Sequence, residues 1–117
     1  MQRGATQRTP TCLRRYFAAA LSAAAYVDGV TVAALYDHHG SYRHMAARKM
    51  AIWALHCSCG MAQGQIAELF NRDRTTINAA IIDVEENFDA PSQQARLQLM
   101  LDELARRLPG DDITTTL

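Results

Sequence analysis

The chain has 117 residues, of which 49% are hydrophobic and 21% charged, a composition typical of one ordinary soluble domain. Its 12 basic and 12 acidic side chains balance, and the uncharged, alanine-rich segment from Tyr16 to Val27 is too short for a membrane span. Three cysteines at spacings that suggest no disulfide framework predict a cytoplasmic protein. A signal peptide at the basic N-terminus is the alternative.

The charges are unevenly distributed along the chain. Residues 1–15 carry a net charge of +4 and residues 41–80 carry +3, whereas residues 16–40 carry −2 and residues 81–117 carry −5. A basic arm and middle are compatible with a surface that faces DNA, and the acidic end with one turned away from it. Ordinary scatter of surface charge is the alternative interpretation.

The first half of the chain predicts helices separated by short loops. Residues 1–10 contain Gly, Thr, Gln and Pro, and predict a flexible basic arm. Residues 11–27 are rich in Ala and Leu without Gly or Pro, which favours a helix that ends at residues 28–29. A short helix is expected over 31–37 and a loop over 38–41. The apolar side chains on one side of the short helix are Val32, Leu35 and Tyr36.

A longer amphipathic helix follows the loop, and Gly60 closes it. Its apolar positions recur at helical spacing and are Ala46, Met50, Trp53, Ala54 and Cys57. We therefore expect Trp53 and Cys57 to be core residues.

From Met61 the pattern changes to two short units. Residues 63–70 predict a two-turn helix, residues 71–72 a tight turn, and Asp73 the cap of a helix that runs to about Asn87. The apolar stripes are Ile66, Leu69 and Phe70 in the first helix, and Ile77, Ala80, Ile81, Val84 and Phe88 in the second.

Pro91 fits the first turn of a last helix, which Pro109 and Gly110 stop. Residues 111–117 are expected to form a flexible tail. The apolar face of this helix comprises Leu97, Met100, Leu101, Leu104 and Leu108. It either packs back on the domain or forms a surface for a protein partner or a homodimer. The predicted class is all-α, with one compact helical domain over residues 11–110.

Two short helices joined by a short turn are typical of a helix-turn-helix, here over about residues 62–87. Ala67 is a small residue where the helices cross, Asn71 tolerates a left-handed turn, and Ile77 packs the second helix onto the first. The outward side chains of the first turn are then of types that bind DNA bases and phosphates: Arg74, Thr75, Thr76 and Asn78. A plain helical hairpin with a polar cap is the alternative.

These residues also carry a resemblance to a known family. The segments Arg72-Asp73-Arg74-Thr75-Thr76-Ile77, Ile66-Ala67-x-x-Phe70 and Ala47-Arg48-Lys49-Met50-Ala51 resemble the signature of domain IV, the C-terminal DNA-binding domain, of the bacterial replication initiator DnaA. That family has Gly-Gly-Arg-Asp-His-Thr-Thr-Val, Ile-Gly-x-x-Phe and Ala/Pro-Arg-Gln-x-Ala at these places. Asn71 stands for the family's Gly-Gly pair, and Arg74 for its His.

The resemblance implies a role for each matching residue. Arg72, Asp73, Thr75 and Thr76 would lie at the major groove, with Asp73 anchoring the start of the recognition helix. Arg48 and Lys49 would contact the DNA backbone. The family's basic loop, which enters the minor groove, corresponds to residues 38–44, where three histidines leave Arg43 as the one permanent positive charge.

No Gly-x-x-x-x-Gly-Lys-Ser/Thr motif is present, so the resemblance does not extend to the ATPase part of an initiator. We therefore expect a bacterial, nucleoid-associated protein that binds double-stranded DNA in a sequence-specific manner and regulates transcription or replication initiation, with no enzymatic activity and no cofactor. The predicted DNA-binding residues are Arg43, Arg48, Lys49, Arg72, Asp73, Arg74, Thr75, Thr76 and Asn78.

Two alternatives remain at this point. The first is a helical adaptor that binds RNA polymerase or a replication initiator and has a weakened DNA surface. The second is a metal site at His56-Cys57-x-Cys59, which is disfavoured because the two thiols fall on different faces and no second cysteine pair completes four ligands. We therefore predict no metal site.

Overall fold

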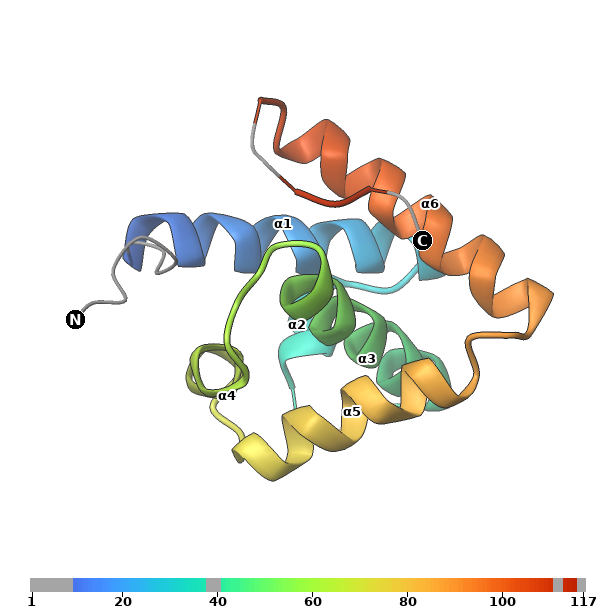
Figure 1. Ribbon diagram of the computed structural model, residues 1–117, viewed down its shortest axis with the longest axis horizontal. Coiled ribbons are helices and arrows are strands. Elements are labelled where there is room, and N and C mark those ends of the chain that lie inside the picture. Colours follow the sequence, from blue (N-terminus) through green and yellow to red (C-terminus); the bar gives the residue numbers. More distant parts are fainter. Residues whose placement is uncertain (1–9, 38–40, 111–112, 116–117) are drawn as a thin grey trace.

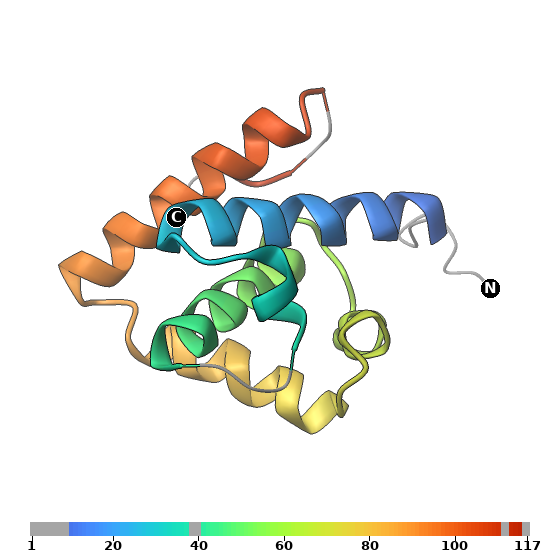
Figure 2. The same ribbon diagram turned by 180° about the vertical axis from the view of Figure 1, so that it is seen from behind.

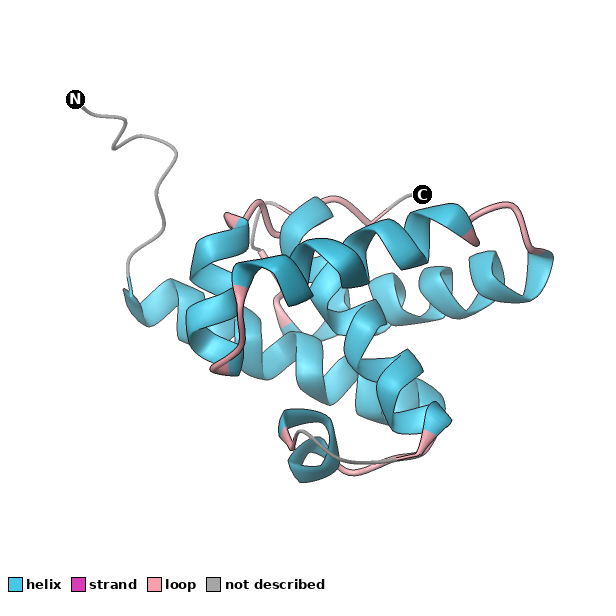
Figure 3. Cartoon of the chain, turned by 90° about the horizontal axis from the view of Figure 1, so that it is seen from below, coloured by secondary structure: helices cyan, strands magenta, loops and turns pink. Residues whose placement is uncertain are grey.

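The structure is a computed structural model that describes residues 10–37, 41–110 and 113–115, apart from the side chains of residues 10–12. Within these residues every regular element is a helix, as Figure 3 shows. In chain order the helices are α1 (Pro10–Asp28), α2 (Val32–Tyr36), α3 (Tyr42–Cys57), α4 (Gln63–Phe70), α5 (Arg74–Glu86) and α6 (Pro91–Arg107). The predicted all-α class is confirmed for this part of the chain.

α1 is a long helix that packs against α3 and α6. It ends at Asp28, after which Gly29 takes a φ of 67°, a left-handed conformation that costs glycine little. The predicted helix over residues 11–27 is confirmed, whereas residues 1–9 of the predicted arm lie outside the described residues. The most buried side chains of α1 are small, which lets neighbouring helices approach closely, and include Ala20, Ala23 and Ala24.

An ion pair joins the end of α1 to the start of α6. Arg96 donates from Nε to Oδ1 of Asp28 at 3.2 Å and from Nη2 to Oδ2 at 2.5 Å. The Asp28 side chain is only 9% exposed, so water screens the pair weakly. Two bonds from one planar guanidinium also fix its orientation. The pair therefore helps to hold α6 across α1, in the upper part of Figure 1.

α2 is a five-residue helix at the edge of the domain, in contact with α1 and α3. The hydroxyl of Thr31 caps it by accepting a hydrogen bond from the Ala34 N–H at 3.2 Å. Of the three apolar side chains predicted on one side, the structure buries only Leu35. The reason is that α2 is short and lies at the edge of the domain, where other helices cover only a narrow part of its surface. Val32 and Tyr36 are 41% and 46% exposed.

α3 runs through the middle of the domain and contacts each of the other five helices. Figures 1 and 2 show it enclosed between α1 and α5 from both sides. Its side chains from Ala47 to Leu55 are buried, apart from Lys49. The predicted amphipathic pattern is therefore wrong for α3, because neighbouring helices cover it almost all round. Trp53 is a core residue as predicted, with its ring centroid 5.8 Å from that of Phe88.

The apolar face of α6 is buried within the domain. Each of its five predicted side chains is at most 2% exposed, and they are Leu97, Met100, Leu101, Leu104 and Leu108. The first interpretation of this face, in which it packs back on the domain, is therefore the one that the structure supports. A partner or dimer surface built from these side chains has no basis in their placement, since none of them reaches the surface.

Residues 113–115 lie against the domain. The Thr114 N–H donates to the carbonyl oxygen of Ser58 at 3.1 Å, and Gln98 Nε2 donates to that of Thr115 at 2.9 Å. Ile113 is partly buried and packs on the core. This part of the predicted flexible tail is therefore held in place, because it supplies backbone partners to the end of α3 and to α6. The rest of the tail lies outside the described residues.

The helices enclose one hydrophobic core to which every helix contributes. The radius of gyration of 13.3 Å is the value expected of a compact domain of this length. None of the described helices combines the length and the apolar content that a membrane span needs.

Candidate functional site

α4 and α5 are joined by a turn at residues 71–73, and Figure 1 shows α4 end-on while α5 runs across the view. Asn71 closes α4 in the left-handed conformation, with φ 56° and ψ 49°, which asparagine tolerates better than most residues. Its N–H donates to the carbonyl oxygens of Ala67 and Glu68, and the Arg72 N–H donates to Ala67 at 2.9 Å. These bonds satisfy the last carbonyls of α4 and end it at Phe70, as predicted.

Asp73 is the N-cap residue of α5 by its backbone. Its carbonyl oxygen accepts the first helical bond from the Ile77 N–H at 3.2 Å. The prediction that Asp73 caps this helix is confirmed for its N-cap position, but its carboxylate makes no capping hydrogen bond and stays exposed. The first N–H groups of α5 therefore receive no bond from this carboxylate.

One turn of α5 presents polar side chains to solvent beside an anchored residue. Ile77 is fully buried and packs α5 into the core. Its neighbours are exposed, and they are Arg74, Thr75, Thr76 and Asn78. The structure therefore brings four of the predicted site residues together on one surface at the start of α5.

A side-chain hydrogen bond links the start of α4 to this surface. Gln63 Nε2 donates to Asn78 Oδ1 at 3.1 Å, although the two residues are far apart in the sequence. Gln65, two residues further along the chain, has a different partner, since its Oε1 accepts from the Ala62 N–H at 3.0 Å and so caps α4. Gln63 is thus a member of the site that the sequence did not identify.

Arg48 is buried, in contrast to its predicted place on the DNA backbone. Its Nε donates to the carbonyl oxygen of Leu35 at 2.7 Å, and its Nη2 donates to those of Ala34 at 3.3 Å and Asp37 at 2.6 Å. Burial and then the neighbouring charge of Arg72 lower the pKa of the Arg48 guanidinium. This side chain is only 8% exposed, and its three bonds hold the end of α2 against α3, while its remaining exposed part lines a groove that Lys49 and Arg72 also line.

Arg72 also turns toward the end of α2. Its Nη2 donates to the carbonyl oxygen of Asp37 at 2.8 Å and its Nη1 to that of Phe70 at 3.3 Å. Its guanidinium carbon lies 5.7 Å from the centroid of the Phe70 ring, a cation–π distance. Burial lowers the pKa of Arg72. The carbonyl of Asp37 thus accepts from Arg48 and Arg72 together, which connects α2, α3 and the turn before α5.

Lys49 lies beside α5, where it forms an ion pair with Asp83. Its Nζ is 2.9 Å from Oδ2 of Asp83, and the two side chains are 35% and 48% exposed. Surface pairs of this kind contribute little to stability, but they lower the net charge that a partner meets. A groove of about 380 Å³ between α3 and α5 is lined by Lys49, Asp83, Arg72 and Thr76, with an apolar floor that includes Met45 and Ile52.

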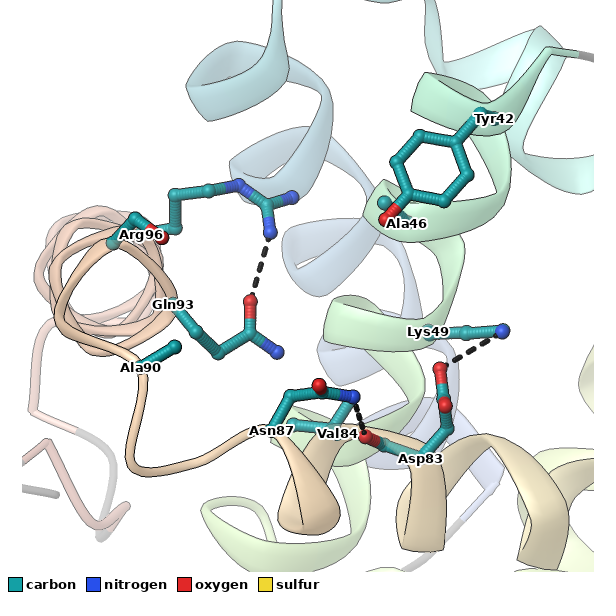
Figure 4. Close-up of a pocket in the computed structure, with 10 residues that line it drawn as sticks. Tyr42, Ala46, Lys49, Asp83, Val84, Asn87, Ala90, Gln93 and Arg96 are labelled. Atoms are coloured by element: carbon teal, nitrogen blue, oxygen red, sulfur yellow. Dashed lines mark hydrogen bonds and ion pairs between the residues drawn. The ribbon is translucent and has the colours of Figure 1, made fainter.

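A second hollow of about 440 Å³ lies where α3, α5 and α6 meet, and Figure 4 shows its lining. Its polar side chains are occupied with one another. Arg96 donates to Gln93 as well as to Asp28, and Asn87 Nδ2 donates to the carbonyl oxygen of Asp83 at 2.8 Å.

Arg43 is exposed at the start of α3, but it lines a different hollow, together with Thr31 and Ser41. His44 caps α3 in a reciprocal arrangement, since its Nδ1 accepts from the Ser41 N–H at 3.0 Å. The remainder of the histidine-rich loop, residues 38–40, lies outside the described residues. The structure therefore does not bring Arg43 to the surface formed by the start of α5.

The His56-Cys57-x-Cys59 segment forms no cluster of metal-ligating side chains. Cys59 is buried and Cys57 is exposed, so the expectation that Cys57 is a core residue is wrong. The reason is that Cys57 stands on the last turn of α3, beyond the part that other helices enclose. His56 Nδ1 lies 2.9 Å from the carbonyl oxygen of Met61. Among the described residues, no three His, Cys, Asp or Glu side chains are arranged to hold a metal ion.

Comparisons of the chain with protein-family profiles, with curated proteins and with solved structures find no match in any of the three.

The structure also assigns contacts that the sequence did not indicate. The carbonyl of Asp37 is a backbone group, and backbone acceptors leave no mark in a sequence. Asp83 and Lys49 are of opposite charge but far apart along the chain, so their pairing depends on the crossing of α3 and α5. The sequence held one signal for Gln63, namely its position at the start of α4. A polar residue at the start of the first helix of a helix-turn-helix lies near the start of the second helix.

Proposed function

We propose that the chain binds duplex DNA in a sequence-specific manner, with α4 and α5 forming a helix-turn-helix whose second helix enters the major groove. The observation that carries this proposal is the exposed polar turn of α5 beside the buried Ile77. Arg can bond O6 and N7 of guanine, and Thr can offer its methyl group to thymine. The uncapped N–H groups at the start of α5 favour a phosphate.

In this proposal seven of the nine predicted site residues divide into two groups. Arg74, Thr75, Thr76 and Asn78 contact bases or the adjacent backbone, and Lys49 contributes a phosphate contact from α3. Arg48 and Arg72 instead fix the position of the turn before α5, as their bonds to the carbonyl of Asp37 indicate. The interface is therefore small and depends on a rigid support.

The resemblance to domain IV of DnaA supports a regulatory role for this binding. Such a surface would compete for initiator-like sites or act at promoters, so we propose a regulator of replication initiation or of transcription. No catalytic residue and no cofactor enter the proposal.

Fluorescence anisotropy over a salt series tests the proposal, with one random duplex and one duplex that contains a DnaA-box-like sequence. With few phosphate contacts, log K should fall with log salt at a slope of about −3. A version of the chain that starts at Pro10 measures what Arg3 and Arg8 of the predicted arm add to that slope. Selection from a random-sequence pool should then enrich one motif.

The alternative is an adaptor that binds a protein, and one observation favours it. Among the basic residues of the predicted site, Arg48 and Arg72 bond to backbone carbonyls, and Lys49 is paired with Asp83. Because these cationic groups already have partners within the chain, the surface attracts DNA weakly. If neither duplex binds at low salt, the DNA-binding proposal is wrong and the adaptor becomes the better account.

A further inference from the structure

We infer that Gln63 is a positioning residue, which fixes the amide of Asn78 so that this end of α5 selects adenine. This inference rests on the proposed DNA-binding function and names a base preference of the same site. Neither residue belongs to the motifs that resemble DnaA domain IV, so the pair is a feature of this chain.

The geometry of the pair sets the direction of the Asn78 amide. Gln63 is the first residue of α4, and Asn78 is the fifth residue of α5, on its exposed side. The bond from Gln63 Nε2 to Asn78 Oδ1 measures 3.1 Å. It requires the oxygen of the Asn78 amide to face α4, so the Nδ2 group faces away from α4.

The remaining hydrogen-bonding groups of Asn78 match adenine. An amide oxygen has two lone pairs and an amide nitrogen has two hydrogens, so Asn78 keeps one acceptor and two donors after it accepts from Gln63. Adenine presents N6 as a donor and N7 as an acceptor in the major groove, and asparagine can satisfy both at once. Guanine presents two acceptors and cannot donate to the Asn78 oxygen.

Fixing the amide in advance also favours binding. A free exposed asparagine loses rotational freedom when it binds a base, which costs free energy. Gln63 already restrains the Asn78 side chain through their hydrogen bond. Gln63 is itself half-buried, and its place on α4 is set by the packing of Ile66 and Phe70, so the restraint is carried by the rigid part of the domain.

The test compares base preferences in random-pool selection for the wild type, Gln63→Glu and Asn78→Ala. A glutamate at position 63 has no N–H to donate, so it would instead accept from Nδ2 of Asn78. The Asn78 amide would then be turned over, and the donor and acceptor that adenine N7 and N6 need would exchange places. We expect adenine to be preferred at one position of the wild-type motif, and Gln63→Glu and Asn78→Ala each to reduce that preference about tenfold. Preferences at the other positions should stay unchanged.

Gln65→Glu is the matched control. It adds the same charge two residues away, and its side-chain oxygen can still accept from the Ala62 N–H. It should weaken binding to all sequences alike, because added negative charge repels phosphate, and it should leave the adenine preference intact. Adding Gln63→Glu to Asn78→Ala should produce no further loss of that preference.

Four outcomes would overturn the inference. If Gln63→Glu retains the adenine preference, the hydrogen bond does not direct the Asn78 amide. If Gln63→Glu weakens binding to all sequences alike, as Gln65→Glu does, the substitution acts only through its added charge. If wild type enriches a motif without adenine at a position sensitive to Asn78→Ala, the assignment to adenine is wrong. If wild type enriches no motif at all, the proposed function fails and this inference fails with it.

Discussion

The guanidinium of Arg48 donates to the carbonyl oxygen of Leu35 at 2.7 Å from inside the domain. Together with its bonds to Ala34 and Asp37, this contact caps the C-terminal end of α2. The last carbonyls of a helix have no partner within it, and buried carbonyls without a partner are costly. Arg48 therefore supplies the hydrogen-bond donors that the last carbonyl oxygens of α2 lack within the helix.

Arg48→Ala should lower the free energy of unfolding by about 2–4 kcal/mol. The reason is that each hydrogen bond from a charged donor contributes about 1.5–3 kcal/mol, offset in part by water that enters the site. The free energy of unfolding of Arg48→Lys should lie between those of the wild type and Arg48→Ala, because an ammonium cannot reproduce the forked donors of a guanidinium. Urea unfolding followed by circular dichroism measures all three.

Arg43→Ala is the control, because Arg43 is exposed at the start of α3. This substitution should leave the free energy of unfolding unchanged within about 0.5 kcal/mol. An Arg48→Ala protein as stable as the wild type, with a salt slope of DNA binding flatter by about one, would contradict this account. It would return Arg48 to the DNA-contacting role that its sequence suggested.

Arg74→Ala should weaken binding to the selected DNA motif by about 1–3 kcal/mol and relax the preference at one base position. Arg74 is exposed at the first position of α5, so its removal should not alter stability. Anisotropy with the motif and with single-base variants measures the effect. Equal affinity of Arg74→Ala and wild type for every duplex would show that Arg74 makes no base contact.

Asp83→Asn should increase DNA affinity and steepen the salt slope by about one. The substitution removes the carboxylate that lies 2.9 Å from the Lys49 ammonium, so Lys49 becomes available to a phosphate. Combining it with Lys49→Ala should abolish the gain. Asp102→Asn removes an equal charge from α6 and serves as the control, and an equal gain there would mean that only net charge matters.

Cys57 should react slowly with iodoacetamide at neutral pH although it is exposed. Partial burial of the thiol, and then the negative charge of Glu85, raise the pKa of Cys57. A raised pKa leaves less thiolate at pH 7, and the thiolate is the nucleophile, so the rate should rise as pH increases beyond the ordinary thiol range.

Mass spectrometry of the Cys57 peptide compares the folded chain with the same residue in urea, where the pKa returns to its ordinary value. Glu85→Gln should speed the folded-state reaction at pH 7, since it removes the second cause of the shift. Equal rates for the folded and unfolded chain would contradict the prediction.

Local signals in the sequence were sufficient for the pair α4–α5. The bounds 63–70, the left-handed turn at Asn71 and the buried Ile77 all follow from helical periodicity and turn chemistry. These features depend on residues within a few positions of one another, and the structure agrees with them. The capping carboxylate of Asp73 is the exception, because the choice between capping and exposure depends on side-chain rotamers.

Features that depend on distant contacts were not predictable in this way. Arg48 precedes apolar residues on a helix and has the pattern of a surface cation, but its partners are backbone carbonyls that lie 11–14 positions earlier. Periodicity placed Cys57 on the apolar stripe of α3, yet burial there depends on which helices surround each turn. The docking of residues 113–115 likewise needs the end of α3 as a partner.

The enclosure of α3 by the other five helices has a consequence for how the domain opens. Amide hydrogens exchange with solvent when a segment opens locally, and segments on the periphery open most readily. Because α3 cannot be exposed without separating its neighbours, its amides should exchange only through global unfolding, whereas α2 and residues 113–115 can open alone. The surface at the start of α5 therefore rests on the most slowly exchanging part of the chain.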